Sequence, residues 1–303
     1  MAWAVRAVSR WLRRPVAPLA NLVGGSERWY LWRGHRVAYT VRGNGPALLL
    51  VHGIYAAASS YEWRRVIDTL AARHTVYTID LLGFGRSDRP AVRYSPALYI
   101  DLLSDFLRDV AAPCTIIASA LAAAYAIATA DRHPERVAAL ALVEPTGYAR
   151  CAHNSGRWGD LLRMPLAVLY NLITSRAALR RDLTLSYAYV TRASDDTIEH
   201  LHRSAHQPGA RHVPSAFLAL QLSLDLKRIW PAMLHPTLLI WGAHPHLSTL
   251  ADLRAFRAAR PAADAAVIEA AGDLPHDECP DDFIEVVTAF LNGVRQDSLV
   301  LPG

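Results

Sequence analysis

Residues 115–124 read Thr-Ile-Ile-Ala-Ser-Ala-Leu-Ala-Ala-Ala. The run 115–118 is apolar and short, as expected of a buried strand, and 121–130 continues in a pattern typical of a helix. Small side chains on both sides of the junction leave room for a sharp bend. The segment predicts a strand that passes directly into a helix through a tight turn.

Further apolar runs of the same kind lie on both sides of this segment. Runs too apolar to alternate are typical of parallel strands that helices cover on both faces. Helical patterns separate them, and strand–helix repetition predicts a doubly wound α/β sheet. We expect strands at 47–51, 76–79, 115–118, 138–143, 238–241 and 266–269, a hairpin of 29–32 with 37–41 at the sheet edge, and helices at 61–72, 96–110, 121–130 and 281–291.

The alternation stops between about 147 and 231, where the pattern is helical without a convincing core strand. A chain of 303 residues suits one large domain with an insertion. We therefore predict a basic N-terminal segment at 1–27, an α/β core formed by 28–146 and 232–303, and an inserted helical cap at 147–231.

The composition, with 52% hydrophobic and 19% charged residues, is that of a globular protein with a large core. The three cysteines are an odd number without clustered spacing, which argues against a disulfide framework or a zinc site and favours a reducing, cytoplasmic compartment. The net charge of +5 comes almost wholly from arginine. No arginine-rich run alternates with stacking aromatics, so we predict no nucleic-acid partner.

The first 26 residues carry no acidic side chain. On a helix Arg6, Arg10 and Arg13 would share one face, with apolar residues opposite. Such a segment can lie on an anionic membrane surface, or it can be a helix that packs on the domain. Arginines interrupt any signal-peptide core, and the segment is too short to span a bilayer. Peripheral membrane contact through residues 1–14 is therefore an open alternative.

Several motifs occur along the chain in a characteristic order: Leu49-Leu50-Val51-His52-Gly53, Ser59-Ser60-Tyr61-x-Trp63, Asp80-Leu81-Leu82-Gly83-Phe84-Gly85-Arg86-Ser87, Trp241-Gly242 and Ala271-Gly272-Asp273-Leu274-Pro275-His276. Together with the 115–124 segment they resemble the α/β-hydrolase superfamily across about 28–292. Within it the chain looks like cap-bearing esterases, haloalkane dehalogenases and epoxide hydrolases. The resemblance implies a mostly parallel doubly wound sheet with an inserted helical cap.

The resemblance also implies where a catalytic triad would stand. The nucleophile of the G-x-S-x-G elbow falls on Ala120, the acid on Pro245 and the base on Asp273. A methyl group cannot attack a carbonyl, and proline cannot orient an imidazole. The backbone N–H groups of Ile54, after His52 and Gly53, and of Leu121 would form the oxyanion hole, which does not depend on side chains. A degenerate triad above a surviving pocket is the expectation.

Three residues could substitute for the missing groups. Ser119 neighbours the apex, and His276 follows the lost base, although a histidine there usually buttresses the loop in relatives. Glu144 lies where some dehalogenases place their acid. Asp273 itself could act as a general acid or base if burial raised its pKa. His244 and His246 on the old acid loop could turn inward or remain solvated.

Metal and cofactor sites are not predicted. His202 and His206 are one helical turn apart, but no cysteine or carboxylate cluster completes a ligand set. Gly83-Phe84-Gly85 lacks the third glycine of a dinucleotide fingerprint.

Three functions remain open. The chain is a non-hydrolytic pseudoenzyme that binds a small apolar molecule or a protein partner in the pocket under the cap. Alternatively it is an isomerase- or lyase-type enzyme that uses Asp273 and the oxyanion hole, or an esterase-like hydrolase that uses displaced residues such as Ser119 and His276. The first is favoured, because triad residues act as a unit and little rate remains without them.

Overall fold

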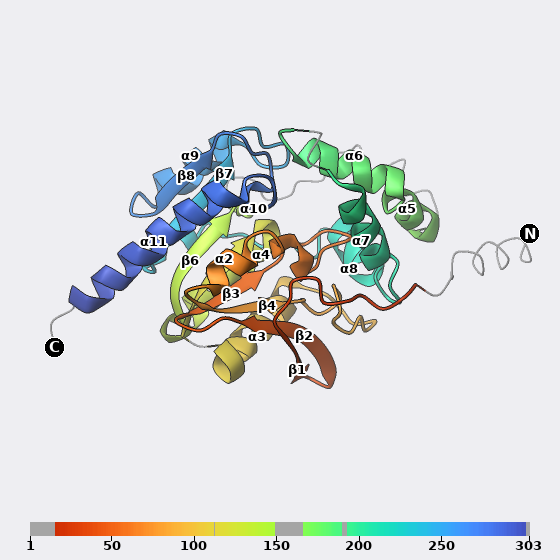
Figure 1. Cartoon of the computed structure of the whole chain (residues 1–303), viewed down its shortest axis with the longest axis horizontal. Helices are drawn as coiled ribbons and strands as arrows, with labels where there is room; N and C mark the ends of the chain where they lie inside the picture. Colours follow the sequence, from red (N-terminus) through yellow and green to blue (C-terminus); the bar gives the residue numbers. More distant parts are fainter. Residues whose placement is uncertain (1–15, 112, 149–165, 190–192, 301–303) are drawn as a thin grey trace, which may run out of the picture.

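The computed structural model describes residues 16–111, 113–148, 166–189 and 193–300. Its centre is an eight-stranded sheet in the order β1-β2-β4-β3-β5-β6-β7-β8 (Figure 1). The β1–β2 and β2–β4 pairs are antiparallel and all the others parallel. The strands are β1 (Ser26–Trp32), β2 (His35–Arg42), β3 (Ala47–Val51), β4 (Thr75–Ile79), β5 (Cys114–Ser119), β6 (Val137–Val143), β7 (Thr237–Gly242) and β8 (Asp264–Ile268).

The doubly wound sheet predicted from the sequence is confirmed. Each predicted strand is present, and the 29–32 and 37–41 hairpin is the edge formed by β1 and β2. Successive residues of the central strands belong to opposite faces, because Leu48 and Leu50 join one apolar cluster whereas Leu49 and Val51 join the other. Both faces are therefore buried, which explains why these strands read as unbroken apolar runs.

Different helices cover the two faces. Helix α3 (Pro96–Phe106) and helix α4 (Ala120–Arg132) cover one face, and α2 (Ile67–Ala71) and α11 (Pro280–Val300) cover the other. The alanines of α4 are buried along most of its length, which lets its backbone approach the sheet closely. On this face α9 (Leu250–Ala259) contributes Phe256.

The predicted helix at 61–72 is wrong in one respect. The chain forms a 3₁₀ turn, η1 (Ser60–Trp63), and only then α2. The amides of Arg64 and Val66 bond to the carbonyls three residues earlier, 3.1 Å away in each case. This tighter winding closes the first turn, and the α-helix begins after it.

Among the described residues, four α-helices lie between β6 and β7: α5 (Leu166–Ile173), α6 (Arg176–Ser186), α7 (Asp195–Ala205) and α8 (His212–Leu218). They gather on one side of the molecule (Figure 1). Leu179, Leu183, Ile198 and Leu201 form a separate apolar cluster with Ala57 of the core. This helical region corresponds to the predicted cap, of which residues 149–165 and 190–192 lie outside the described residues.

Polar contacts join these helices to the core. The Tyr187 hydroxyl at the end of α6 donates to Asp277 Oδ2, and Asp277 Oδ1 lies 2.8 Å from Arg64 Nη2 and 3.1 Å from Arg65 Nε. Within the described part of the chain, no helix has both the length and the apolar character needed to cross a membrane. The predicted membrane segment at 1–14 lies outside the described residues and stays a prediction.

Candidate active site

Ala120 stands at the junction of β5 and α4, at the carboxyl edge of the sheet. The φ angle of Ala120 is 50°, in the left-handed region that residues other than glycine rarely adopt. The residue is half-buried. Such a conformation costs of order 1–3 kcal/mol and persists only where the surroundings impose it. The turn thus has the strained backbone of a nucleophile elbow and presents a methyl group.

Two backbone N–H groups near this turn have no acceptor. Neither the amide of Ile54 nor that of Leu121 donates a hydrogen bond to any residue in the described ranges, and both residues are buried. Buried donors of this kind normally find a partner. It remains a prediction that the N–H groups of Ile54 and Leu121 act together as an oxyanion hole.

His52 and Gly53 serve the structure of the loop that carries Ile54. His52 Nε2 accepts from the Leu81 amide at 3.0 Å, so Nδ1 carries the proton and donates to Gly53 O at 2.7 Å. The Gly53 amide donates to Glu62 Oε2 at 3.1 Å. Both predicted pocket residues are therefore committed to holding the turn in place.

Glu144 and Asp273 form a buried carboxyl pair beside the β7 end of the sheet. Asp273 Oδ1 accepts from the amides of His246 and Leu247 at 2.7 and 3.0 Å. Glu144, which follows β6 with φ of 46°, accepts from Gly242 N at 3.2 Å and from Ser248 Oγ at 2.6 Å. The sheet thus brings together two carboxyl groups that follow β6 and β8 in the sequence.

Burial and the neighbouring Asp273 raise the pKa of Glu144 to about 8, the Asp273 carboxyl acting both through its charge and through a hydrogen bond between the two groups. Burial also raises the pKa of Asp273, although the amides of Leu247 and His246 act in the opposite direction. A hydrogen bond between two carboxyl groups requires a proton on one of them. The raised pKa of Glu144 therefore predicts one proton on the pair at neutral pH.

Pro245, at the predicted position of the triad acid, is half-buried in the loop after β7. Its neighbours His244 and His246 are exposed, so neither imidazole turns into the fold. The carboxyl group that does stand beside position 273 is Glu144, which the sequence offered only as a substitute.

His276 is fully buried in α10 (Pro275–Glu278) between Trp63 and Phe283, with ring centroids at 4.4 and 5.7 Å. Its Nε2 lies 3.3 Å from Glu62 Oε1. Burial by itself would raise the pKa of Glu62, but the hydrogen bond and charge of His276 outweigh it and hold that pKa below its usual range. His276 is thus committed to Glu62.

Ser119 is buried and faces the His52–Gly53 turn. A Cβ placed on Gly53 would lie 3.5 Å from Ser119 Oγ and 3.6 Å from Glu62 Oε2. Among the described residues no hydrogen bond joins Ser119 to His276. The geometry of these two residues does not form a nucleophile–base pair.

The sequence interpretation missed two residues that organise this region. Glu62 bridges Gly53 and His276, and it stood in the unassigned position of the Ser59-Ser60-Tyr61-x-Trp63 motif. Ser248 links Glu144 to Trp241 Nε1, which donates to its hydroxyl at 2.8 Å. The only sequence signal for Ser248 was its place a few residues after Trp241-Gly242.

The rings of His202 and His206 stack with their centroids 4.0 Å apart, and His206 Nδ1 lies 2.7 Å from the carbonyl oxygen of His202. In the described ranges no group of three histidine, cysteine or acidic residues is arranged to hold a metal ion.

Comparison with known proteins shows which family this chain belongs to. An uncharacterized protein of Mycobacterium tuberculosis is 28% identical over 295 residues, covering 92% of this chain and 85% of that protein. The pimeloyl-[acyl-carrier protein] methyl ester esterase of Aeromonas hydrophila is 25% identical, covering 82% of this chain and 96% of the esterase. A solved membrane phospholipase A superposes with a TM-score of 0.77 at 24% identity, covering 97% and 92% of the two chains, and therefore shows the shared fold.

The family profile of the alpha/beta hydrolases matches residues 48–286, which include the elbow, both carboxyl groups and His276. Described homologues are hydrolases, including the esterase above and a 2-(acetamidomethylene)succinate hydrolase of Mesorhizobium japonicum, 23% identical over 271 residues. The chain therefore belongs to the alpha/beta hydrolase family.

Proposed function

We propose that this chain is a non-hydrolytic member of the family and binds a small apolar ligand or a partner at the site beneath its helical cap. The observation that carries the proposal is the methyl group of Ala120 at the φ = 50° apex of the β5–α4 turn. Backbone N–H groups can stabilise an oxyanion, but they cannot supply the nucleophile that ester hydrolysis on this fold requires.

The state of the other triad positions supports the proposal. Asp273 does not replace the histidine of a triad, because a carboxyl group has no second ring nitrogen through which an acid could orient it, and its Oδ1 already accepts from the amides of His246 and Leu247. Oxyanion donors and binding alone leave a residual acceleration of order 10³–10⁴ over water, well below that of a working enzyme. We therefore expect no reaction of the native chain with p-nitrophenyl esters or fluorophosphonate probes.

Restoring the missing groups tests the proposal directly. An imidazole at position 273 would stand beside Glu144, so the acid is already in place and Pro245 can stay. We expect the variant A120S/D273H to be labelled by a fluorophosphonate probe, measured as an adduct by intact mass spectrometry.

The matched controls are A120S alone and A120S/D273N, which supplies the hydroxyl without a base. We expect both to label at least tenfold more slowly than A120S/D273H, because general-base assistance contributes about 10²–10⁴-fold. Labelling of the native chain that disappears in S119A would instead show hydrolysis through displaced residues, and the proposal would be wrong.

The carboxyl pair favours a second candidate function. A carboxylic acid with a pKa near 8 can donate and accept a proton at neutral pH, as isomerases and lyases require. In that case E144Q would abolish the turnover of a carbonyl substrate, whereas A120G would leave that turnover unchanged. Deuterium exchange at the α-carbon of a bound ketone, followed by NMR, distinguishes this function from simple binding.

For the ligand itself, the names of the relatives point to acyl compounds, which supports an apolar molecule with a carbonyl group. We also propose a cytoplasmic location with peripheral membrane contact through residues 1–14, because that segment is basic and lacks acidic residues. Native mass spectrometry of the purified chain would detect a retained ligand, and vesicle co-sedimentation with and without residues 1–14 tests the membrane contact.

A further inference from the structure

Strand β1 forms one edge of the described sheet, with β2 as its neighbour (Figure 1). It pairs with β2 over all of its 7 residues in one unbroken register, from Ser26 opposite Val41 to Trp32 opposite His35. It contains neither proline nor lysine, two residues that commonly protect sheet edges from further pairing. A regular edge strand of this length is a template to which another strand can bind.

The hydrogen bonds of β2 show which residues of β1 have outward-facing backbone groups. The carbonyl oxygens of Arg36 and Ala38 each accept from an amide of the segment that follows β4, at 2.9 Å, so they point away from β1. In an antiparallel pair, a residue whose backbone groups point away lies opposite another of the same kind. Trp29 lies opposite Ala38. Leu31 lies opposite Arg36, so the N–H and C=O groups of both β1 residues face outwards.

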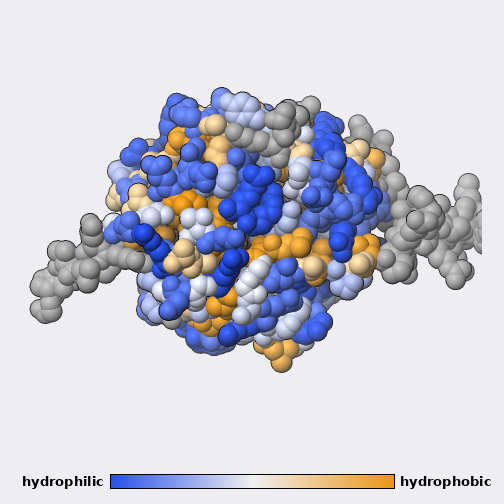
Figure 2. Space-filling view, viewed as in Figure 1, coloured by the Kyte–Doolittle hydropathy of each residue, from blue (hydrophilic) through white to orange (hydrophobic). Residues whose placement is uncertain are grey.

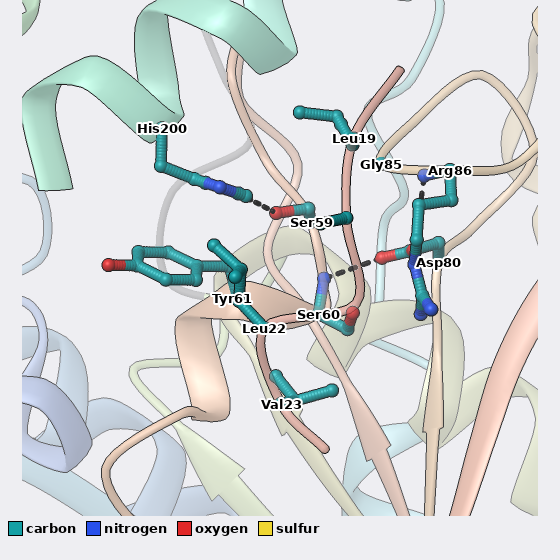
Figure 3. Close-up of a pocket in the computed structure, with 11 residues that line it drawn as sticks. Leu19, Leu22, Val23, Ser59, Ser60, Tyr61, Asp80, Gly85, Arg86 and His200 are labelled. Carbon is teal, nitrogen blue, oxygen red and sulfur yellow. Dashed lines mark hydrogen bonds and ion pairs between the residues drawn. The ribbon is translucent and has the colours of Figure 1, made fainter. Parts of the chain in front are cut away.

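Glu27 follows the same alternation, so three residues of β1 present backbone groups at this edge. In the described part of the chain, no residue forms a hydrogen bond with these outward-facing groups. The chain that precedes β1 does not cover them, because Leu19, Leu22 and Val23 line a hollow together with His200 of α7 (Figure 3). The edge is therefore open for a further strand.

Two copies of β1 fit each other when they run antiparallel about a two-fold axis at Trp29. Trp29 then lies opposite Trp29 of the partner subunit, and Glu27 lies opposite Leu31 of the partner subunit. Each of these opposed pairs exchanges two backbone hydrogen bonds. All the outward-facing groups of both copies are paired in this register, whereas any other register leaves some of them without a partner. The strand is therefore complementary to itself, as an interface with two-fold symmetry requires.

The charges beside β1 also favour a second copy as the partner. Arg28 is exposed and has no ion pair among the described residues, and in this register it lies opposite Tyr30 of the partner subunit. Within one chain the Tyr30 hydroxyl donates to Asp109 Oδ2 at 2.7 Å, in the π-helical turn η2 (Leu107–Ala111). Arg108 pairs with both Asp105 and Asp109, so this cluster keeps one negative charge. Opposed residues on antiparallel strands extend to the same side, which brings Arg28 towards Asp109 of the partner subunit.

We propose that β1 is a dimerisation edge, on which a second copy of this chain binds antiparallel and continues the sheet across the two-fold axis. A contact between two short strands is small, which suits a weak and reversible dimer. Three strands separate β1 from β5, so the proposal does not depend on the function of the elbow.

Sedimentation equilibrium of the full chain tests the proposal, and it should show a monomer–dimer equilibrium over an about hundredfold range of concentration. W29P removes an N–H that faces outwards, at a place where edge strands tolerate proline. W29A loses the same indole but keeps the N–H, so it is the matched control. We expect W29P to dimerise at least about tenfold more weakly than W29A, because each dimer loses two hydrogen bonds.

The charge contact has a test of its own. R28E places a carboxylate beside Asp109 of the partner subunit and should weaken the dimer about tenfold, because like charges across an interface repel. R254E makes the same charge reversal on the exposed side of α9 and should leave the dimer unchanged.

A cysteine at the two-fold axis reports the register directly. Opposed Cα atoms lie about 5.5 Å apart, within the range of a disulfide, so W29C should cross-link when diamide is added as the oxidant. In L31C the two introduced cysteines would lie roughly 14 Å apart, so L31C should cross-link no faster than the native chain.

Weakening by R28E, together with cross-linking of W29C and not of L31C, supports the proposal. Both variants leave the β1 backbone unchanged, so they decide the question even if W29P fails to fold. A chain that stays monomeric at every concentration overturns the proposal. A dimer that neither W29P nor R28E weakens also overturns it, because another face or the N-terminal segment then forms the contact.

Discussion

At the scale of single residues, Glu144 links the site to the pH dependence of stability. Its pKa of about 8 in the folded chain exceeds that of an unfolded glutamate, so the folded chain binds more protons between about pH 4.5 and 8. The free energy of unfolding must then fall as the pH rises through this range.

We expect the free energy of unfolding of the native chain to fall by on the order of 2–4 kcal/mol between pH 5 and pH 9. E144Q keeps one acceptor oxygen for Gly242, its amide nitrogen can donate to Asp273, and it does not titrate, so its stability should change much less with pH. Urea unfolding at several pH values measures the difference. Parallel curves for the two chains would show that the carboxyl pair does not hold a shared proton.

Ala120 makes a second prediction at this scale. Glycine adopts positive φ without steric cost, so A120G should be neutral or stabilise by up to about 1 kcal/mol. The same change at Ala124, in the ordinary helical conformation of α4, should destabilise by about 1 kcal/mol. Thermal unfolding of both variants measures the contrast, and equal losses would mean that the elbow backbone is not strained.

At the scale of helices and strands, the end of β7 is the most tightly packed point near the site. A Cβ on Gly242 would lie 2.1 Å from the Gly272 carbonyl oxygen, whereas one on Gly293 in α11 meets nothing within 4 Å. G242A should therefore cost more than about 3 kcal/mol, and G293A should stabilise by about 0.5–1 kcal/mol. Chemical denaturation measures both, and a tolerated G242A would contradict the close approach of the two loops.

The strands were predictable from the sequence because burial on both faces leaves an unbroken apolar run, as in β5. The elbow position was predictable because the segment, with small residues on both sides of Ala120, resembles the G-x-S-x-G turn of the α/β-hydrolases. The Glu144–Asp273 pair was not, since residues more than a hundred positions apart meet only through sheet order. Nor was the role of Glu62, because a buried glutamate cannot be distinguished from a solvated one without its partners.

At the scale of the whole molecule, the surface view shows polar side chains over most of this face, with apolar residues exposed in bands between them (Figure 2). The cap helices join the core through Tyr187, Asp277 and the arginines of the η1–α2 segment. This contact ties the end of α6 to the loop that carries Asp273, whose amide donates to Ser186 O at 2.7 Å. The end of α6 therefore contacts the backbone of one member of the carboxyl pair directly.

Y187F should loosen the α6 contact at a cost of about 1–2 kcal/mol. We expect faster hydrogen exchange in α6 than in α4, because local opening follows the weakened contact. Y94F, which removes a hydroxyl bonded to Pro90 O at 2.9 Å within a core loop, is the matched control and should leave α6 unchanged. Uniform acceleration in Y187F would show that the cap does not open as a separate unit.

The conformation of Ala120 has an evolutionary consequence. Codons for alanine and serine can differ by a single base, as can codons for aspartate and histidine. A lineage that keeps the bent backbone at position 120 and an acid at 144 thus needs only two base changes to place a serine at the apex and a histidine at position 273. Substitution of the apex residue by glycine would relieve the backbone strain and still leave serine one base change away, so either small residue preserves the turn that a nucleophile would need.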